Sequence, residues 1–371
     1  MKISKKIIVL LLAAAALPLG AAPKELKVLA IGNSFSASMF QTFPAIVAAD
    51  PECKLVLAGA TIGGCSLERH WREHLKAEKD PKYRPYSKKY TLRQLLTKEK
   101  WDVVTIQQAS RESWRASTFA PYAENLIGLI RELAPGAEIV IQQTWSYNAA
   151  APSLAKWKID APTMYKKLTE NYTSLAKQHD FRVIPTGYAV ELYRKAMGDK
   201  LIAVTPADTS KIVEPDLPRT TDVAGGFAWR KNAKTGKKAL AKDFHHLNTR
   251  GRYLQGLVWY AFLFGKDPEK NAYVPKGISG EEAALLKQCA KQAAAEFPQA
   301  AGVMATKWVG ILAVAVYALP FIGMLYASIM LLFKIKAPSW HPGLVIFILW
   351  LIAIIAFGIL VAATAFSTTV A

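Results

Sequence analysis

Two short segments, far apart in the sequence, carry the residue types of a serine nucleophile and its base. Ser34 directly follows an apolar run and a glycine in Val28-Leu29-Ala30-Ile31-Gly32-Asn33-Ser34, and Asp243 precedes His246 by three residues. A serine hydroxyl needs a general base to take its proton, and a carboxylate on the other ring nitrogen orients that base. Each segment alone also has an ordinary reading, because Ser34 could cap a helix and Asp243 could lie in a surface loop.

Two further segments offer groups that could stabilise an oxyanion. Gly63 and Gly64 follow a second apolar run, and paired glycines at the end of a strand can expose a backbone N–H, although they also suit a tight turn. Gln107 and Gln108 follow a third run, where a carboxamide could donate a hydrogen bond. Arg69, His70 and Trp71 come shortly after the glycines, so they are either substrate contacts or the start of a helix.

An alternation of short apolar runs and longer segments of helical period must position these residues. The predicted strands are Leu26 to Ile31, Lys54 to Ala58, Val103 to Gln107, Glu138 to Gln142 and Arg182 to Ile184. The predicted helices are Phe40 to Ala49, Phe119 to Leu133, Ala161 to Gln178, Tyr188 to Met197, Gly251 to Phe264 and Glu281 to Phe297. This pattern predicts a three-layer α/β/α domain with a central parallel sheet, flavodoxin-like in its winding.

Two segments do not fit the alternation. Residues 76–100 are dense in lysine and tyrosine, and residues 205–242 are rich in polar residues, Gly and Pro. Long irregular segments in a compact domain are usually functional loops or flexible surface. Because the second segment precedes His246, we expect it to be a substrate-facing loop.

The two ends of the chain differ from its middle. Residues 1–22 have three lysines before an apolar run and small residues after it, which is typical of a signal peptide. Residues 304–371 contain two uncharged apolar runs, about 308–333 and 343–366, long enough to predict a membrane anchor of two transmembrane helices. The hydrolase-like domain then spans residues 23–303. Lysines between the two runs place that domain on the periplasmic or extracellular side.

The net charge and the cysteine content restrict the function less than the motifs do. The net charge of +19 suits an acidic polymer or an anionic membrane surface, but a solvated lysine-rich surface explains it as well. The three cysteines allow at most one internal disulfide, and they show no metal-ligand spacing. We expect no metal, no cofactor and no nucleic-acid partner.

The order of the motifs resembles the four sequence blocks of the SGNH (GDSL-like) hydrolase superfamily. The strings GNSFS, GGCSLERHW, WDVVTIQQAS and DFHHLNTRGRYL are most similar to a bacterial branch catalogued as a domain of unknown function. The resemblance implies Ser34 as nucleophile, His246 as base and Asp243 as its orienting acid. It also implies an oxyanion hole formed by the N–H of Ser34, an N–H of Gly63 or Gly64, and an amide side chain.

The sequence departs from the superfamily at two points. Asn33 stands where Gly-Asp-Ser has aspartate, and Gln107-Gln108-Ala109-Ser110 stands where Gly-x-Asn-Asp is usual. The asparagine donor is therefore missing, and Gln107 or Gln108 is the predicted substitute, with Gln107 preferred. His245 is an alternative base, but its spacing from Asp243 does not match the pattern.

The resemblance implies a serine esterase that hydrolyses an O-acyl ester, most simply an O-acetyl ester, on a glycan or cell-envelope polymer. Its partners would be an acylated glycan or other small ester and, through the two C-terminal helices, the membrane. One alternative is a membrane-bound O-acyltransferase of the envelope. Another is a catalytically inactive glycan-binding module, which the missing asparagine suggests.

Overall fold

A computed structural model describes residues 23–204, 212–231 and 235–299, together with Trp350 and Ile354. The chain divides into two compact units, and every residue of the site discussed below lies in the first unit, Met1–Tyr172 with Val183–Phe297. The second unit comprises Thr173–Arg182 and Pro298–Ala371.

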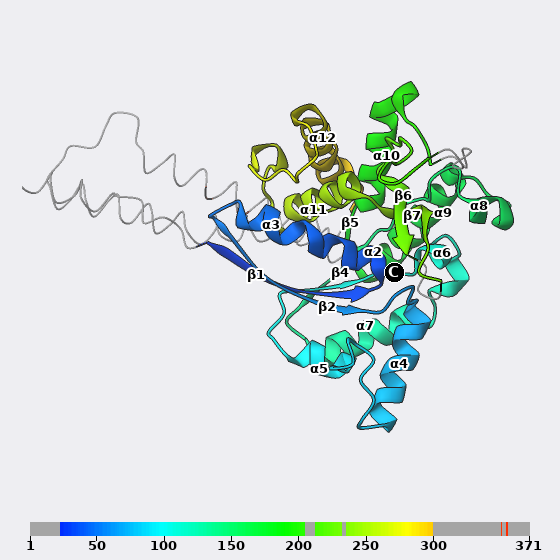
Figure 1. The fold of residues 1–371 in the computed structure, drawn as a ribbon. Coiled ribbons are helices and arrows are strands. Elements are labelled where there is room, and N and C mark those ends of the chain that lie inside the picture. Colours follow the sequence, from blue (N-terminus) through cyan, green and yellow to red (C-terminus); the bar gives the residue numbers. More distant parts are fainter. Residues whose placement is uncertain (1–22, 205–211, 232–234, 300–349, 351–353, 355–371) are drawn as a thin grey trace, which may run out of the picture. The chain divides into compact units, whose positions relative to one another are not determined.

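The centre of the first unit is a five-stranded sheet whose order is β2-β1-β3-β4-β5 (Figure 1). Its strands are β1 Lys24–Gly32, β2 Cys53–Thr61, β3 Val103–Ile106, β4 Glu138–Gln142 and β5 Arg182–Ile184. β1 pairs in parallel with both β2 and β3, and β3 pairs in parallel with β4. Residues 28–31 of β1 are fully buried, as expected for a strand covered on both faces. The predicted central parallel sheet and its flavodoxin-like order are confirmed.

Helices cover both faces of the sheet (Figure 1). One layer contains α3, α10, α11 and α12, and the other contains α4, α5 and α7. The longer helices are α4 Leu67–Lys79, α7 Tyr122–Leu133, α9 Ala161–His179, α10 Thr186–Met197, α11 Thr249–Phe264 and α12 Gly280–Glu296. The shorter ones are α2 Ser34–Ala37, α3 Phe43–Ala48, α5 Leu92–Thr97, α6 Ser110–Ser113 and α8 Pro152–Trp157, with 3₁₀ turns η1 Ser38–Gln41, η2 Ala116–Thr118, η3 Gly198–Lys200 and η4 Pro268–Lys270.

Three expectations about local structure need correction. The helix expected over Phe40 to Ala49 is divided between η1 and α3, because a proline stands in the first turn of α3. Residues 76–100 are not wholly irregular, since they contain the end of α4 and the whole of α5, which a capping box at Thr91 starts. Residues 205–242 contain β6 Ala224–Lys231 and half of β7 Lys238–Leu247, which form an antiparallel pair.

The prediction of two C-terminal transmembrane helices is not supported. Within the part of the chain that the structure describes, no helix is both long and apolar enough to cross a bilayer. The runs at about 308–333 and 343–366 lie outside the described residues, apart from Trp350 and Ile354, and so does the predicted signal peptide at residues 1–22. The described residues therefore form an α/β domain, and no membrane-spanning helix is found among them.

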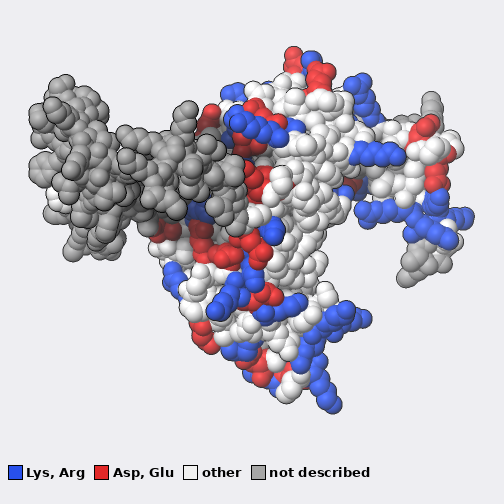
Figure 2. Space-filling view, turned by 90° about the vertical axis from the view of Figure 1, so that its left-hand side faces the viewer, with Lys and Arg blue, Asp and Glu red and all other residues white. Residues whose placement is uncertain are grey.

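The charged side chains do not form a field of one sign on the face shown in Figure 2. Lys and Arg side chains alternate there with Asp and Glu side chains. The excess of positive charge in the sequence is thus not concentrated on this face.

Candidate active site

Ser34 lies at the carboxyl end of β1, at the first position of the one-turn helix α2. Asn33 caps this helix, because its side-chain oxygen accepts a hydrogen bond from the N–H of Phe35 at 2.9 Å. The Asn33 amide also donates to the carbonyl of Cys65 at 3.0 Å. Asn33 therefore joins the turn that carries Ser34 to the turn that contains Gly63 and Gly64.

Asp243 and His246 come from the last part of β7, where the pairing with β6 is irregular. Gly226 pairs with Asp243 and Ala224 pairs with Leu247, so one residue of β6 faces three residues of β7. A bulge of this kind bends a strand and redirects its side chains. In a regular strand, residues three apart point to opposite faces, and the bulge is what lets Asp243 and His246 meet.

Gly225 makes this bulge sterically possible. Its φ is +91°, and a Cβ atom at this position would lie 2.7 Å from the carbonyl oxygen of Asp243. Only glycine combines that backbone conformation with so close an approach.

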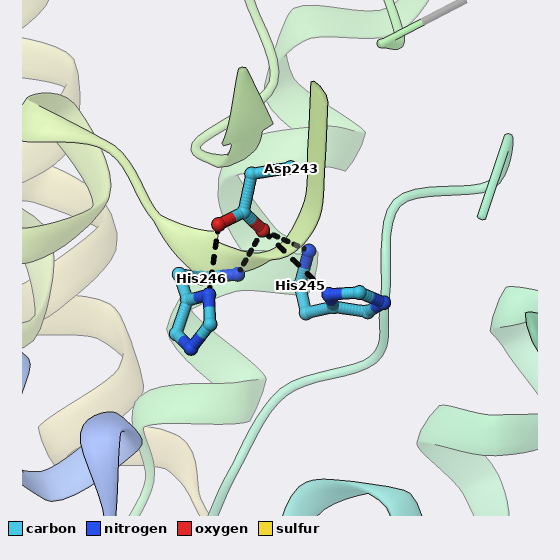
Figure 3. A group of neighbouring side chains, drawn as sticks. All are labelled: Asp243, His245 and His246. Atoms are coloured by element: carbon cyan, nitrogen blue, oxygen red, sulfur yellow. Dashed lines mark hydrogen bonds and ion pairs between the residues drawn. The ribbon is translucent and has the colours of Figure 1, made fainter. Parts of the chain in front are cut away.

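The three side chains form a continuous hydrogen-bonded series. The Ser34 hydroxyl lies 2.9 Å from Nε2 of His246, and Nδ1 of His246 lies 2.8 Å from Oδ2 of Asp243. Figure 3 shows the second contact and how both histidines surround the Asp243 carboxylate. The His246 ring also packs edge-on against Phe35, with 5.5 Å between ring centroids. This is the geometry in which an imidazole can take a proton from a serine hydroxyl.

The carboxylate of Asp243 is held in its ionised form. Partial burial raises its pKa, but hydrogen bonds from the His246 side chain and from the N–H groups of His246 and His245 outweigh burial and lower the pKa well below the ordinary value. An ionised carboxylate at Nδ1 fixes the tautomer of His246 with its basic nitrogen toward Ser34.

His245, the alternative base, contacts Tyr147 and Asp243, whereas the hydrogen bond to Ser34 comes from His246. Its ring packs edge-on against Tyr147 at 4.3 Å, and its Nδ1 lies 3.7 Å from Asp243 Oδ1. Its backbone carbonyl accepts a hydrogen bond from the Trp145 indole at 2.7 Å. These contacts anchor β7 and leave His246 as the residue that meets Ser34.

Three backbone N–H groups are available for an oxyanion. Those of Ser34, Gly63 and Gly64 have no hydrogen-bond acceptor among the described residues. The turn that contains the glycines is fixed from outside by Arg111, which donates to the Gly64 carbonyl at 2.9 Å. Arg111 was not singled out from the sequence, because its role depends on a contact with a distant turn.

The structure does not support Gln107 or Gln108 as the missing amide donor. The oxygen of Gln107 accepts from Asn33 N–H and Ser36 Oγ, and its amide nitrogen donates to the carbonyl of Gln108. The oxygen of Gln108 accepts from two backbone N–H groups, and its nitrogen donates to Thr118. Both buried amides hold loops together, and their orientation is fixed by the backbone donors.

The three predicted substrate contacts on α4 differ in position. His70 is fully buried and bonds to Gly32 and Tyr86, so it cannot touch a substrate. Arg69 pairs with Glu73, and Trp71 packs on His74, both within α4 itself. All three residues lie on the helix that begins after the Gly-Gly turn, as one of the two alternatives predicted, and burial excludes only His70 from contact with a substrate.

Asp243, His245 and His246 are also a group whose potential ligand atoms lie within 4.8 Å of one another. Carboxylate and imidazole are suitable ligands for zinc. A metal bound by all three would have to replace the 2.8 Å bond between His246 and Asp243, on which the orientation of His246 depends. The same residues thus fit a proton relay or an ion, but not both at once.

Comparison with known proteins gives a fold and, for part of the chain, a match to a family. Residues 27–201 match the family described as Domain of unknown function (DUF4886). The structure of a DUF4886 family protein from Bacteroides uniformis is similar to this chain with a TM-score of 0.57 and 23% sequence identity, covering 76% of this chain and 99% of the other. No curated protein matches.

Other similar solved structures carry names from the SGNH and esterase groups. A protein described as a candidate SGNH hydrolase from Slackia heliotrinireducens has a TM-score of 0.41 and 20% identity, over 63% of this chain and 97% of its own. The acetyl xylan esterase AlAXEase has a TM-score of 0.38 and 13% identity, over 64% of this chain and 98% of its own. The match over residues 27–201 to the DUF4886 family agrees with the resemblance to a bacterial domain of unknown function that the sequence motifs indicated.

Proposed function

We propose that the chain is a serine esterase that transfers an acyl group from an ester to water. The observation that carries this proposal is the series Ser34 Oγ to His246 Nε2 at 2.9 Å and His246 Nδ1 to Asp243 Oδ2 at 2.8 Å. Nucleophile, base and orienting carboxylate are within reach of one another before any substrate binds.

The reaction follows from this geometry. Ser34 Oγ forms a bond to the ester carbonyl carbon while its proton passes to Nε2 of His246. The tetrahedral intermediate collapses, the bond to the alcohol oxygen breaks, and the alcohol leaves with the proton from His246. Water then attacks the acyl-enzyme by the same relay and releases the carboxylic acid.

The negative charge on the carbonyl oxygen would be stabilised by backbone N–H groups. Those of Ser34 and of the Gly63-Gly64 turn are the donors we assign to it. Because both turns are joined through Asn33 and the Cys65 carbonyl, their spacing is set before the reaction begins.

The substrate we propose is an O-acetyl ester on a glycan or cell-envelope polymer. His246 is exposed and Ser34 is partly exposed, so a site formed from loops at the edge of the sheet can accept a small acyl group on a bulky alcohol. The exported location that residues 1–22 predict is compatible with such a polymer.

The test is the hydrolysis of p-nitrophenyl acetate by the full chain and by three single variants. We expect Ser34→Ala and His246→Ala each to lower kcat by about 1,000-fold or more. His245→Ala is the matched control and should retain most of the activity, since its ring faces Tyr147. Undiminished turnover in folded Ser34→Ala protein would refute the proposal.

A further inference from the structure

A pocket of about 130 Å³ opens beside the catalytic pair, and the mechanism above does not use it. It lies between the β6–β7 hairpin and the start of α11. Asp243 and His246 form part of its wall, and so do three cationic side chains, those of Arg230, Lys242 and Arg252. A group bound there would be next to a substrate attacked by Ser34.

The three cations are not neutralised by the protein. Among the described residues, none of them lies within ion-pair distance of a carboxylate. Arg252 donates only to neutral oxygens, the Leu247 carbonyl at 2.9 Å and Gln41 Oε1 at 2.7 Å. By contrast, Lys238 on the same hairpin pairs with Glu214 at 2.5 Å. The pocket therefore gathers three cations without a carboxylate partner beside the catalytic pair.

The carboxylate within the pocket does not change this conclusion. Asp243 is the only acidic residue in the wall, and its oxygens are already bound by the His246 side chain and by two backbone N–H groups. An anion that entered the pocket would meet three cations and a single carboxylate, that of Asp243, whose oxygens already accept hydrogen bonds.

A row of aromatic rings extends from the same centre toward the surface. Phe35 contacts the His246 ring and lies 6.5 Å from Tyr147, which in turn lies 5.6 Å from Trp157. Trp157 lies 5.6 Å from Trp114, and these two tryptophans are half-buried whereas Phe35 and Tyr147 are buried. Flat, partly exposed indole rings can pack against the C–H face of a sugar.

Cations also accompany the exposed end of this row. The Arg115 guanidinium lies 5.8 Å from the Trp114 ring and the Lys167 ammonium 5.7 Å from it. Neither has a carboxylate partner among the residues that the structure describes. Cations without a carboxylate partner thus lie both in the hairpin pocket and at the exposed end of the aromatic row, and the aromatic row adds rings suited to a sugar.

We infer that the natural substrate is an O-acylated glycan that carries anionic groups, carboxylate or phosphate. The hairpin pocket binds one anionic group near the ester, and the tryptophans support sugar rings farther along the chain. Arginine forks and ammonium groups bind carboxylate and phosphate through charge-assisted hydrogen bonds. This inference rests on the proposed esterase function and adds the chemical class of the alcohol.

The test compares two polymers of matched acetyl content, chemically O-acetylated polygalacturonate and chemically O-acetylated dextran. The full chain should have a kcat/KM for the anionic polymer at least about tenfold above that for the neutral one, a margin that narrows in high salt. The double variant Arg230→Gln/Lys242→Gln should lose about tenfold on the anionic polymer, and its activity on dextran acetate and p-nitrophenyl acetate should change less than about twofold.

The matched control is Lys231→Gln/Lys237→Gln, which removes two exposed charges from the same hairpin outside the pocket. It should leave all three activities unchanged. Equal loss in both double variants, or no preference for the anionic polymer, would overturn the inference while leaving the esterase function intact. Absence of Ser34-dependent hydrolysis of p-nitrophenyl acetate would instead remove the proposed function.

Binding measurements distinguish the two anionic groups and do not depend on turnover. Calorimetry with unacetylated galacturonate oligomers and, separately, with glycerol phosphate shows which anion the pocket accepts. Binding of either that weakens in Arg230→Gln/Lys242→Gln but not in the control supports the pocket, and binding of neither contradicts it.

Discussion

Nε2 of His70 lies 3.0 Å from the backbone carbonyl oxygen of Gly32, two residues before Ser34. Because a carbonyl can only accept, Nε2 must carry the proton. Nδ1 is then an acceptor, and the Tyr86 hydroxyl donates to it across 2.9 Å. These two buried hydrogen bonds connect Tyr86, in the segment 76–100, to the Gly32 carbonyl beside Ser34. They fix the orientation of the His70 ring and its tautomer.

Tyr86→Phe removes only the hydroxyl that donates to Nδ1 of His70. The Gly32 carbonyl still requires the proton on Nε2, so Nδ1 becomes a buried acceptor without a hydrogen bond and the ring loses one of its two anchors. An unsatisfied buried acceptor costs about 1–3 kcal/mol. Because His70 holds the Gly32 carbonyl beside Ser34, we expect kcat for p-nitrophenyl acetate to fall by at most the corresponding ~5- to 150-fold, while KM changes little. If Tyr86→Phe loses thermal stability but keeps the kcat of the parent, the hydrogen bonds of His70 are only structural.

The burial of His70 also predicts how stability depends on pH. Desolvation lowers the pKa of His70 from 6.5 to about 4, so the unfolded chain binds a proton there between these values and the folded chain does not. This contribution is complete above pH 6.5 and is lost as pH falls toward 4. The urea midpoint of the parent should drop over that range, and that of His70→Gln should drop less.

The pKa of His74 is also lowered, mainly by desolvation, and this residue supplies a control. His74→Gln removes a second buried histidine from the same helix, one that does not contact Gly32. It should flatten the pH dependence less than His70→Gln does. An identical pH profile in the parent and in His70→Gln would contradict the assignment.

Asn33→Asp is an almost isosteric change that removes the hydrogen bond between the turn carrying Ser34 and the turn containing Gly63 and Gly64. An ionised aspartate can still accept from the Phe35 N–H, but it cannot donate to the Cys65 carbonyl as Asn33 does. The turn with Gly63 and Gly64 should then shift, and kcat should fall by about tenfold or more through weaker oxyanion stabilisation. Affinity for a neutral transition-state-like boronate would decrease in parallel. Full activity in Asn33→Asp would show that the hydrogen bond from Asn33 to Cys65 does not determine the geometry of the oxyanion hole.

Zinc is expected to inhibit the enzyme reversibly. Asp243, His245 and His246 can together bind Zn²⁺, which would break the bond that orients His246. Added Zn²⁺ should lower the hydrolysis of p-nitrophenyl acetate, a chelator should restore it, and the chelator alone should change nothing. His245→Ala, which removes one ligand but no part of the relay, should weaken the inhibition. Loss of activity on chelation would contradict a proton relay in these residues.

Much of the sheet could be predicted from the sequence because its strands are short apolar runs between helical segments. The runs beginning near Leu26, Val103 and Glu138 all became strands of the central sheet. The serine segment and the Asp-x-x-His segment were also recognisable, since their chemistry depends on residue types that lie close together in the sequence. The structure places these three side chains within hydrogen-bond distance.

Other features depend on contacts that local sequence does not reveal. The β6–β7 pair lacks clear alternation, because glycines and lysines occupy much of it, and the bulge opposite Gly225 is set by strand pairing. His70 follows the Gly-Gly turn as a substrate contact would, yet the face of α4 on which it lies is turned toward the core. Gln107 ends a strand as an oxyanion donor would, but its amide is directed inward.

The central claim is that Ser34 is activated by His246, and covalent trapping tests it most directly. The full chain would be treated with a fluorophosphonate, which reacts with activated serines, and the modified residue located by mass spectrometry of its peptides. The account predicts one adduct, on Ser34, which is absent in Ser34→Ala and forms much more slowly in His246→Ala. An unlabelled Ser34 in folded protein, or labelling that does not depend on His246, would contradict it.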